Sequence, residues 1–562
     1  MKKLNKKKNK QQLAKYIVPH NSSLLSALKI ININQNKACV ILKNNKFLKV
    51  VTDGDIRRAL IKGFSLSDKI ENVHDRVSKF FFNTDPKSKI LNSINSRFSL
   101  IPILNSKHEL IDIIFDKKEK IISIKNKKIS IIGLGYVGLT LSLVLAENDL
   151  DVIGYDNNDD IITKIKNKKS PFFERYINEY LSKNVNKNFR VTSDIDKFIA
   201  DIYIICVGTP VDTKTKKPKT NTLLKSISNI AFKIKKGDLV ILRSTVPTGF
   251  TRNKVIPVLQ KYSKLKAGKD FKISFCPERT IEGKALEELS ELPQIIGGYD
   301  KESSDISINF FNTYSKTVID VGSLEAAELC KLIDNSYRDV KFAYANQIAL
   351  LCEKLNLNAH DIISKVNLGY DRNDIAFPSP GVGGPCLSKD PYILHNNFVN
   401  NKISKSIILN ARKLNEDVPL QIYKRIFSLY ERKKKNIKSL KIFIIGFAFK
   451  GEPETSDIRD STTINFLDIL ISNKHKMIFG YDPIVKKENL KKLNIKVCDL
   501  NSGFKNADIV MFMNNHKMYS KLNITKLAKS MNDNSILYDG WNIYKSEIFN
   551  SIKNIKFIGV GK

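Results

Sequence analysis

A cysteine that follows a glycine-rich turn is the residue of this sequence best placed to act as a nucleophile. The segment PSPGVGGPCLSKDPYIL (378–394) contains three glycines that let the backbone come close to a ligand: Gly381, Gly383 and Gly384. Cys386 follows them at a point where a helix could begin, and a helix N-terminus and Lys389 would both favour the thiolate. Three other cysteines lie in apolar patterns typical of small buried residues: Cys206, Cys330 and Cys352.

A second pattern is typical of a dinucleotide-binding turn. In KISIIGLGYVGLTLSLVLAENDLDVIGYD, an apolar strand leads into a GxGxxG turn, an apolar helix and a second strand followed by Asp156. Gly133 permits a tight turn, Gly135 lets a pyrophosphate approach the backbone closely, and Gly138 lets the helix pack closely on the strand. A carboxylate at Asp156 would bond a ribose 2′-hydroxyl and repel a 2′-phosphate, so we expect NAD rather than NADP. An NAD domain combined with a cysteine in a glycine loop indicates oxidation through a covalent thioester.

These residues need a frame of alternating strands and helices. Strand patterns recur in ADIYIICVGTP, DLVILRST, KISFCPE and TVIDVG, with helical stretches between the first three, and this alternation predicts a mostly parallel sheet covered on both faces. Residues 323–355 have apolar residues at helical spacing without Pro or Gly and predict one long helix that spans two domains. A second nucleotide-type fold begins at KIFIIGFAFKG and continues through MIFGYDP, DIVMFMNNH and SILYDGWN.

The composition is that of a globular protein. The chain has 562 residues, 42% hydrophobic and 27% charged, which excludes a largely disordered or fibrous chain and suggests three or four domains. Its net charge is +37, but the lysines are scattered among Asn and Ile without a basic stripe, so we expect solvated basic faces and no nucleic-acid partner. Seven cysteines and seven histidines show no metal-ligand spacing, and no metal is expected. Without an apolar run of 18 residues or a signal peptide, we predict a cytoplasmic protein with no transmembrane segment.

From residue 16 to about residue 125 one pattern occurs twice. ACVILKNNKFLKVVTDGDIRRAL predicts a strand, a turn at Asn44-Asn45, a strand and a helix from near Asp55, and SLIPILNSKHELIDIIFDKKEK repeats this order. The stretch resembles a pair of cystathionine-β-synthase (CBS) domains, a regulatory module that commonly binds adenine nucleotides. The resemblance implies that Thr52 and Asp55 hold a ribose. Phe115 and Lys118 take these places in the second copy, so one half-site is expected; the alternative is a structural or dimerising module without a ligand.

From about residue 128 to residue 562 the sequence resembles the nucleotide-sugar 6-dehydrogenase family, which oxidises the C6 alcohol of a UDP-sugar to a carboxylate with two NAD. The family's motifs occur in its order: GLGYVG, VGTP (207–210), STVPTG (244–249), CPER (276–279), KLIDN, GGPCLSKDP and GFAFKGEPETSDIRDS. The resemblance covers about three quarters of the chain, and most members lack the N-terminal module.

The resemblance implies a role for individual residues. Cys386 would form the thioester, Lys331 and Asn335 on one helix face would stabilise oxyanions, and Asp390 would position or activate water. Two further residues are placed near the reacting carbon: Thr245 and Glu278. Cofactor contacts are implied for Gly133, Gly135, Tyr136, Val137, Gly138, Asp156, Val207, Thr209, Pro210 and Thr245. Substrate contacts are implied for Arg279, Glu282, Lys331, Asn335, Arg372, Gly383, Lys450 and Arg459, the last from a neighbouring subunit; ion pairs with Glu452, Glu454 or Asp457 are the alternative for Lys450 and Arg459.

Within the family, the CPER segment favours a UDP-N-acetylhexosamine, because Arg279 could donate to an acetamido carbonyl. Glu282 departs from the proline-glycine continuation common in that branch, which leaves UDP-N-acetylmannosamine, UDP-N-acetylglucosamine and a galacto epimer open. UDP-glucose is the alternative substrate. A nucleotide-sensing regulator with an inactive dehydrogenase body is the alternative of another class, and the intact catalytic residues argue against it. The expected product is a uronic acid for surface polysaccharide synthesis.

We therefore predict an α/β protein with two Rossmann-like parallel-sheet domains joined by a long central helix and preceded by a CBS-pair α/β module. The predicted regions are a basic tail (1–15), a CBS pair (16–125), an NAD-binding Rossmann domain (128–322), a central helical domain with the cysteine loop (323–437) and a UDP-sugar-binding Rossmann-like domain (438–562). The expected partners are a UDP-sugar, an adenine nucleotide at the CBS pair and further copies of the chain in a homodimer or higher homo-oligomer.

Overall fold

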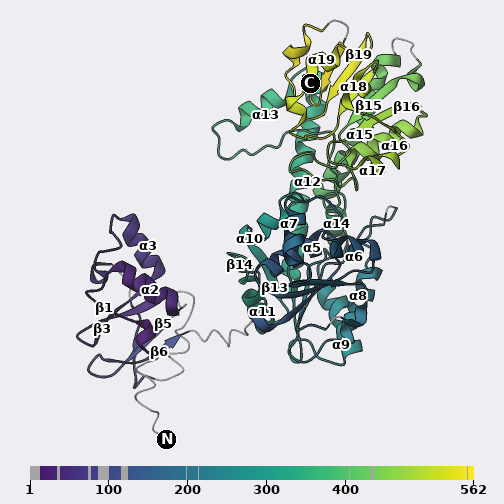
Figure 1. Cartoon of the computed structure of the whole chain (residues 1–562). Coiled ribbons are helices and arrows are strands. Elements are labelled where there is room, and N and C mark those ends of the chain that lie inside the picture. Colours follow the sequence, from purple (N-terminus) through teal and green to yellow (C-terminus); the bar gives the residue numbers. More distant parts are fainter. Residues whose placement is uncertain are drawn as a thin grey trace. The chain divides into compact units, whose positions relative to one another are not determined.

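The computed structural model describes residues 13–34, 38–73, 78–85, 100–115, 124–197, 199–212, 214–403, 405–431, 436–552 and 555–562. The chain divides into two compact units, residues 1–122 and 123–562 (Figure 1). Among the described helices none is both long and apolar enough to cross a membrane.

The N-terminal unit contains two three-stranded sheets with the same pairing. Strand β1 (Ile17–Pro19) pairs in parallel with β2 (Ala38–Lys43), which pairs antiparallel with β3 (Lys46–Thr52). In the same way β4 (Phe81–Phe82) pairs in parallel with β5 (Leu100–Leu104), which pairs antiparallel with β6 (Leu110–Phe115). The two halves predicted as a duplication thus share their strand order.

Two helices complete the first half of this unit, α2 (Leu24–Asn34) and α3 (Asp53–Ile61). Helix α3 begins two residues before the predicted start because Thr52 serves as its N-cap. The predicted turn is present, with positive φ angles at Asn44 and Asn45. The helix predicted after β6 falls in residues 116–123, which lie outside the described residues.

The first large sheet has eight strands in the order β14-β13-β12-β11-β10-β7-β8-β9. Their bounds are β7 (Lys128–Ile132), β8 (Asp151–Tyr155), β9 (Phe189–Thr192), β10 (Ile202–Ile205), β11 (Leu239–Leu242), β12 (Lys272–Phe275), β13 (Gln294–Gly298) and β14 (Val318–Asp320). Strands β7 to β12 form the doubly wound order 3-2-1-4-5-6. All neighbours are parallel except β12 and β13, so the predicted mostly parallel sheet is confirmed, while β9 and β13 were not predicted.

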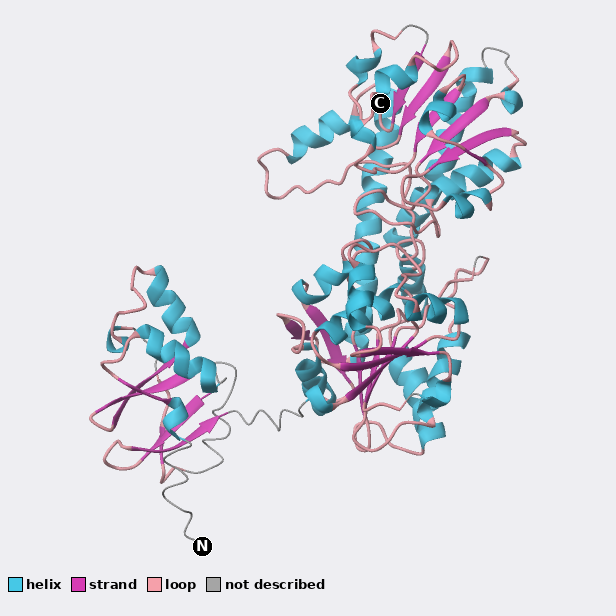
Figure 2. Cartoon of the chain, in the orientation of Figure 1, coloured by secondary structure: helices cyan, strands magenta, loops and turns pink. Residues whose placement is uncertain are grey.

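Helices cover both faces of this sheet, as Figure 2 shows, and bury two apolar cores against it. They are α5 (Tyr136–Glu147), α6 (Asp159–Lys166), α7 (Ile177–Asn184), α8 (Asn221–Ala231), α9 (Ile256–Ser263), α10 (Ala285–Glu291) and α11 (Lys301–Phe311). A π-helical turn (Thr251–Val255) leads into α9.

A single helix of 32 residues, α12 (Leu324–Leu355), connects the two large sheets (Figure 1). Ser323 caps its start, and Asn356 ends it in the left-handed region, so the predicted long helix is confirmed. Three further helices belong to this central region: α13 (Ala359–Asn367), α14 (Asp390–Asn400) and α15 (Ile407–Glu431). Helices α14 and α15 pack against α12.

The second large sheet has six parallel strands in the order β17-β16-β15-β18-β19-β20, again 3-2-1-4-5-6. They are β15 (Lys441–Ile445), β16 (Met477–Tyr481), β17 (Lys496–Val497), β18 (Ile509–Phe512), β19 (Ser535–Asp539) and β20 (Ile555–Gly559). The helices are α16 (Thr462–Ser472), α17 (Lys487–Lys491), α18 (Leu500–Phe504) and α19 (Ile524–Ala528). The predicted second nucleotide-type fold is confirmed, with β17 and β20 added.

Candidate active site

The GxGxxG turn has the geometry that a dinucleotide needs. Gly133 adopts a φ of +91°, and a Cβ on Gly138 would lie 1.8 Å from the Gly133 carbonyl oxygen, so both positions require glycine. A Cβ on Gly135 would meet no atom within 4 Å, which leaves the N-terminus of α5 open to a pyrophosphate. Asp156 lies just beyond β8 and accepts a hydrogen bond from the Leu134 amide at 2.8 Å. These residues fit NAD.

The VGTP segment lies beside this turn. It follows β10, which pairs with β7, so the two segments meet at the switch point where doubly wound sheets bind ligands. The Thr209 hydroxyl donates to the Thr245 carbonyl at 2.5 Å, which ties this segment to the loop after β11. The predicted cofactor residues therefore gather at one edge of the sheet.

Cys386 is exposed, but it does not lie at a helix start. Helix α14 begins four residues later at Asp390, where Pro391 favours the first turn, so the predicted position of Cys386 at a helix N-terminus is wrong. The Cys386 carbonyl accepts from the amides of Lys389 and Asp390 at 3.2 and 3.0 Å. The thiol thus stands on a turn that leads into α14.

A cavity of about 320 Å³ opens beside Cys386. Its wall includes five residues with a predicted catalytic or substrate-binding role: Glu282, Lys331, Gly383, Cys386 and Lys450. Phe449 and Trp541 of the C-terminal domain also line it and were not predicted, although Trp541 is the only tryptophan of the chain. The cavity therefore brings together side chains from the α12 helix, the cysteine loop and both large α/β domains.

Lys331 is the buried cation of this cavity. Only 7% of the residue is exposed, yet among the described residues it has no hydrogen-bond or ion-pair partner. A buried ammonium without a partner is costly, so its charge is suited to a bound ligand. The pKa of the nearby Glu278 carboxyl lies below its usual range. Burial raises this pKa, but the positive charges of Arg243 and Lys331, together with hydrogen bonds, lower it by more.

Asn335 and Asp390 contact each other directly. Asp390 is fully buried and accepts from the Asn335 side-chain amide and from the Lys389 ammonium, the latter at 2.6 Å. Arg338, which was not predicted, donates to the Asn335 side-chain oxygen. Both ends of the Asn335 amide are thus engaged by protein groups, and its contact with the buried carboxylate orients Asp390.

Glu278 forms a buried ion pair with Arg243, whose second amino group lies 3.2 Å from the Cys276 sulfur. The other Glu278 oxygen accepts from the amides of Arg279 and Thr280 at 2.8 Å. Arg243 was not predicted, but a charged residue that ends the apolar run DLVIL is a signal that could have found it.

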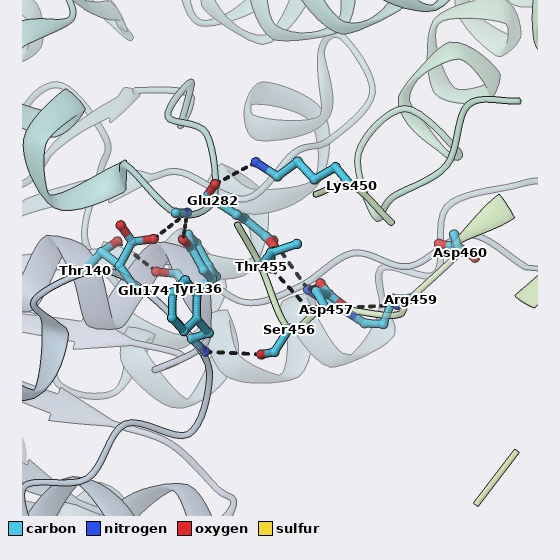
Figure 3. Close-up of polar contacts among 12 residues, drawn as sticks. Tyr136, Thr140, Glu174, Glu282, Lys450, Thr455, Ser456, Asp457, Arg459 and Asp460 are labelled. Atoms are coloured by element: carbon cyan, nitrogen blue, oxygen red, sulfur yellow. Dashed lines mark hydrogen bonds and ion pairs between the residues drawn. The ribbon is translucent and has the colours of Figure 1, made fainter. Parts of the chain in front are cut away.

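Glu282 and Lys450 lie where the NAD-type domain meets the C-terminal domain (Figure 3). The Lys450 ammonium donates to the Glu282 carbonyl at 2.6 Å, and the Thr455 hydroxyl donates to the Glu282 carboxylate at 3.1 Å. Burial raises the pKa of Glu282 to about 7 and lowers the pKa of Lys450 to about 8. Arg459 pairs with Asp457 and lies 3.8 Å from Glu282, so it makes the ion pair considered as its alternative.

The next residue, Gly283, links this cluster to the cofactor turn through Tyr136 and Glu174, which Figure 3 shows beside Glu282. Its amide donates to the Tyr136 hydroxyl at 2.6 Å and to the Glu174 carboxylate at 2.7 Å. Glu174, which the sequence did not reveal, also accepts from the Ala285 amide at 3.0 Å. The first turn of α5 is thereby joined to the segment that carries Glu282.

Four predicted substrate residues are not in the described cavity wall: Arg279, Asn335, Arg372 and Arg459. Arg279 donates to the Pro293 carbonyl at 3.5 Å. Arg372 is exposed on the loop after α13, with its guanidinium 5.7 Å from the centre of the Tyr370 ring.

In the N-terminal unit, Thr52 and Asp55 form a capping box for α3. The Thr52 hydroxyl donates to the Asp55 carboxylate at 2.6 Å and accepts from the Asp55 amide at 3.1 Å, and Arg58 pairs with the same carboxylate. In the second copy Phe115 ends β6, and Lys118 lies outside the described residues. The two groups predicted to hold a ribose thus already stabilise a helix start.

One protein family matches the larger unit through three successive domains. The UDP-glucose/GDP-mannose dehydrogenase family matches through its NAD binding domain at residues 127–315, its central domain at 325–417 and its UDP binding domain at 443–546. The chain is 32% identical over 437 residues to UDP-N-acetyl-D-mannosamine dehydrogenase of Pyrococcus horikoshii, covering 77% of this chain and 98% of that protein. It is 31% identical over 406 residues to the enzyme of the same name from Campylobacter jejuni, covering 71% and 97%.

Solved structures agree with these matches. The UDP-D-ManNAc dehydrogenase structure from Pyrococcus horikoshii superposes with a TM-score of 0.70 at 30% identity, over 77% of this chain and 99% of that one. An NDP-N-acetyl-D-galactosaminuronic acid dehydrogenase from Methanosarcina mazei Go1 superposes with a TM-score of 0.66 at 27% identity, over 80% and 98%.

Proposed function

This chain belongs to the UDP-glucose/GDP-mannose dehydrogenase family, whose members are NAD-dependent oxidoreductases, and we propose that it oxidises the C6 hydroxyl of a UDP-N-acetylhexosamine to a carboxylate. UDP-N-acetylmannosamine is the first candidate, because relatives named UDP-N-acetyl-D-mannosamine dehydrogenase align with this chain over almost their whole length. UDP-N-acetylglucosamine is the second, and the uronic acid would serve surface polysaccharide synthesis. The observation that carries the proposal is the unpartnered ammonium of Lys331 in the cavity wall that also contains Cys386.

The cofactor contacts belong to the turn before α5 and its neighbours. The open N-terminus of α5 at Gly135 suits the pyrophosphate, Asp156 suits a ribose, and the VGTP segment lies alongside. NAD, when bound, accepts the hydride that leaves C6 in each of the two oxidations.

Lys331 acts in the first oxidation. The C6 hydroxyl loses its proton and C6 loses a hydride, which gives an aldehyde. The Lys331 ammonium stabilises the negative charge that develops on the C6 oxygen, because it is buried and has no competing partner.

Cys386 acts in the second oxidation. Its thiolate adds to the aldehyde carbon, and the carbonyl oxygen takes up a proton to give a thiohemiacetal. Loss of that proton and of a hydride from C6 gives the thioester. Water then adds to the thioester carbonyl, and the C–S bond breaks with its electron pair on sulfur. The sum is one alcohol and one water converted to a carboxylate, with two hydrides and three protons released.

Asp390 assists the hydrolysis of the thioester. It lies four residues after Cys386, and contacts from Asn335 and Lys389 hold its carboxylate. From this position it orients or deprotonates the attacking water.

The proposal is tested by incubating the purified chain and NAD with UDP-N-acetylmannosamine, UDP-N-acetylglucosamine, UDP-N-acetylgalactosamine and UDP-glucose. We expect the highest kcat/KM for an N-acetylhexosamine. A preference for UDP-glucose would support that sugar as the substrate and contradict the proposed N-acetylhexosamine. No NADH from any of the four sugars would support the alternative of an inactive dehydrogenase body with a regulatory role.

We propose further that two copies of the chain associate through α12. Five large apolar side chains on this helix are more than half exposed: Ile333, Tyr337, Tyr344, Leu351 and Leu355. Tyr337, Tyr344 and Leu351 are spaced by seven residues and so form one stripe along the helix. A second α12 presenting the same stripe is a matching partner for it.

The N-terminal unit is proposed to bind an adenine nucleotide at Thr52 and Asp55. The start of α3 supports this, since a helix N-terminus attracts phosphate, although the capping box gives both side chains a structural role as well. Calorimetry on the full chain with ATP, ADP and AMP tests it. Asp55→Ala should abolish the heat of binding, whereas Asp53→Ala, in the same helical turn, should retain it. No heat with any nucleotide would leave the unit as a structural module.

A further inference from the structure

We propose that Arg412, a buried arginine on α15, is the positioning residue that holds the cysteine loop of residues 379–387 in place for the thioester step. The inference rests on the proposed role of Cys386. Arg412 is not among the described residues that line the cavity, so it acts through the loop and not on the substrate.

The contacts of Arg412 bracket the nucleophile. One amino group of its guanidinium donates to the Val382 carbonyl at 2.7 Å, and the other donates to the Leu387 carbonyl at 2.9 Å. These carbonyls stand four residues before and one residue after Cys386. A planar guanidinium has donors on both sides and can hold both carbonyls at once, whereas a lysine carries its donors on a single nitrogen.

A carboxylate on the central helix fixes Arg412 in turn. Asp339 of α12 is fully buried and accepts from Arg412 at 2.9 Å and from the Asn415 side-chain amide at 2.9 Å. Lys331 lies on the same helix eight residues earlier, at about 1.5 Å of rise per residue. One rigid helix therefore sets the position of the ammonium in the cavity and, through Arg412, the position of the thiol.

Further buried hydrogen bonds hold the start of the loop. The Ser379 amide donates to the Asn346 side chain of α12 at 2.8 Å, and Asn346 donates to Asn415 of α15 at 3.0 Å. The loop is thus attached to both helices through directional bonds, and each bond broken would leave a buried polar group unpaired. Such bonds fix one geometry more strictly than apolar packing would.

The two oxidations depend differently on this geometry. In the proposed sequence the first hydride leaves before the thiol adds, so a displaced loop should leave the first oxidation largely intact. Thiol addition and the second oxidation require Cys386 within reach of the aldehyde carbon, and a misplacement of about 1 Å can cost on the order of 100-fold in rate.

The test compares Arg412→Lys with Arg425→Lys. Arg425 lies on the same helix and likewise contacts one carboxylate, Glu353, and two main-chain carbonyls, but these belong to the C-terminal segment and not to the cysteine loop. Single-turnover release of NADH is followed with UDP-N-acetylmannosamine and excess NAD. In Arg412→Lys we expect a first NADH at a rate within about threefold of wild type and a second slowed about 100-fold. Arg425→Lys should release both as wild type does.

Hydrogen–deuterium exchange gives a readout that needs no turnover. Amides of residues 379–387 should exchange faster in Arg412→Lys than in wild type or Arg425→Lys, with the NAD-type domain unchanged. If Arg412→Lys does not fold, Asp339→Asn should show the same selective slowing, by about tenfold. Unchanged exchange, or equal slowing of both oxidations, would overturn the inference.

Cys386→Ser separates this inference from the proposed function. If Cys386→Ser stops after one NADH while Arg412→Lys matches wild type, the thioester mechanism stands and the role of Arg412 is wrong. If Cys386→Ser releases two NADH as wild type does, the proposed mechanism itself is wrong.

Discussion

Single buried charges define the chemistry of the cavity. Lys331 has no described partner, Asp390 is held by Asn335 and Lys389, and Glu278 is held by Arg243. A cation without a partner is available to a substrate, whereas the paired carboxylates are fixed in place. Lys331 is therefore the group proposed to meet the substrate, and the paired carboxylates are those proposed to orient it or the attacking water.

Replacing Lys331 by Ala should lower kcat by about 10²–10³-fold, because the developing oxyanion loses its stabilising charge. The KM for the UDP-sugar should change much less, and both are measured from initial rates of NADH formation. Lys354→Ala, an exposed position on the same helix, is the matched control and should leave kcat unchanged. A Lys331→Ala enzyme with near wild-type kcat would remove Lys331 from the chemistry.

Glu174 gives a prediction about pH. Burial raises the pKa of its carboxyl from 4.5 to about 7 in the folded chain, against the charge of Lys450 and three backbone hydrogen bonds that lower it. Between these values the folded state keeps a proton that the unfolded chain has lost. The contribution that Glu174 makes to the free energy of unfolding is therefore at its full value below about pH 4.5 and is lost as pH rises through 7.

Glu174→Gln cannot titrate, so its Tm should change less than that of wild type between about pH 5 and pH 8. The expected difference is a few degrees, since about 1 kcal/mol shifts Tm by roughly 2–4 °C. Glu179→Gln, an exposed position on α7, should follow the wild-type curve. Parallel curves for Glu174→Gln and wild type would contradict the prediction.

In the turn between β7 and α5, one glycine is needed for packing and another leaves space for the cofactor. Gly138→Ala should lower Tm by several degrees, because its Cβ would collide with the Gly133 carbonyl. Gly135→Ala should leave Tm unchanged, since its φ is ordinary and its Cβ meets no protein atom, but should weaken NADH binding at least tenfold by filling the pyrophosphate space. Thermal melts and NADH fluorescence titrations measure the two effects. Unweakened NADH binding in Gly135→Ala would place the pyrophosphate elsewhere.

Helices and strands with a regular apolar pattern were the part of the fold that the sequence could predict. The helix over 323–355 and most strands of both large sheets were predictable, because their apolar periodicity is a local signal. The start of α14 was missed because glycines suggested an early turn, while Pro391 places the helix at Asp390. Arg243, Arg338 and Glu174 were missed because their importance comes from partners distant in sequence or from burial, which a local pattern does not reveal.

At the scale of the whole molecule, the apolar stripe on α12 predicts a homodimer. Tyr344→Glu with Leu351→Glu should convert it to monomers, because two added charges from each copy would be buried at the contact. Sedimentation velocity at micromolar concentration measures the change. Lys225→Glu, an exposed position on α8, should remain dimeric. A monomeric wild type, or a dimeric double variant, would contradict the proposed interface.

The measurement that tests the central proposal most directly is the yield of NADH per UDP-N-acetylhexosamine in wild type and in Cys386→Ser. The wild type should release two NADH per sugar and yield a carboxylate. The variant should stall after the first oxidation, because a serine hydroxyl without a strong base adds poorly to the aldehyde. A wild type that stops at one NADH, or a variant with near-normal turnover and two NADH per sugar, would contradict the thioester mechanism.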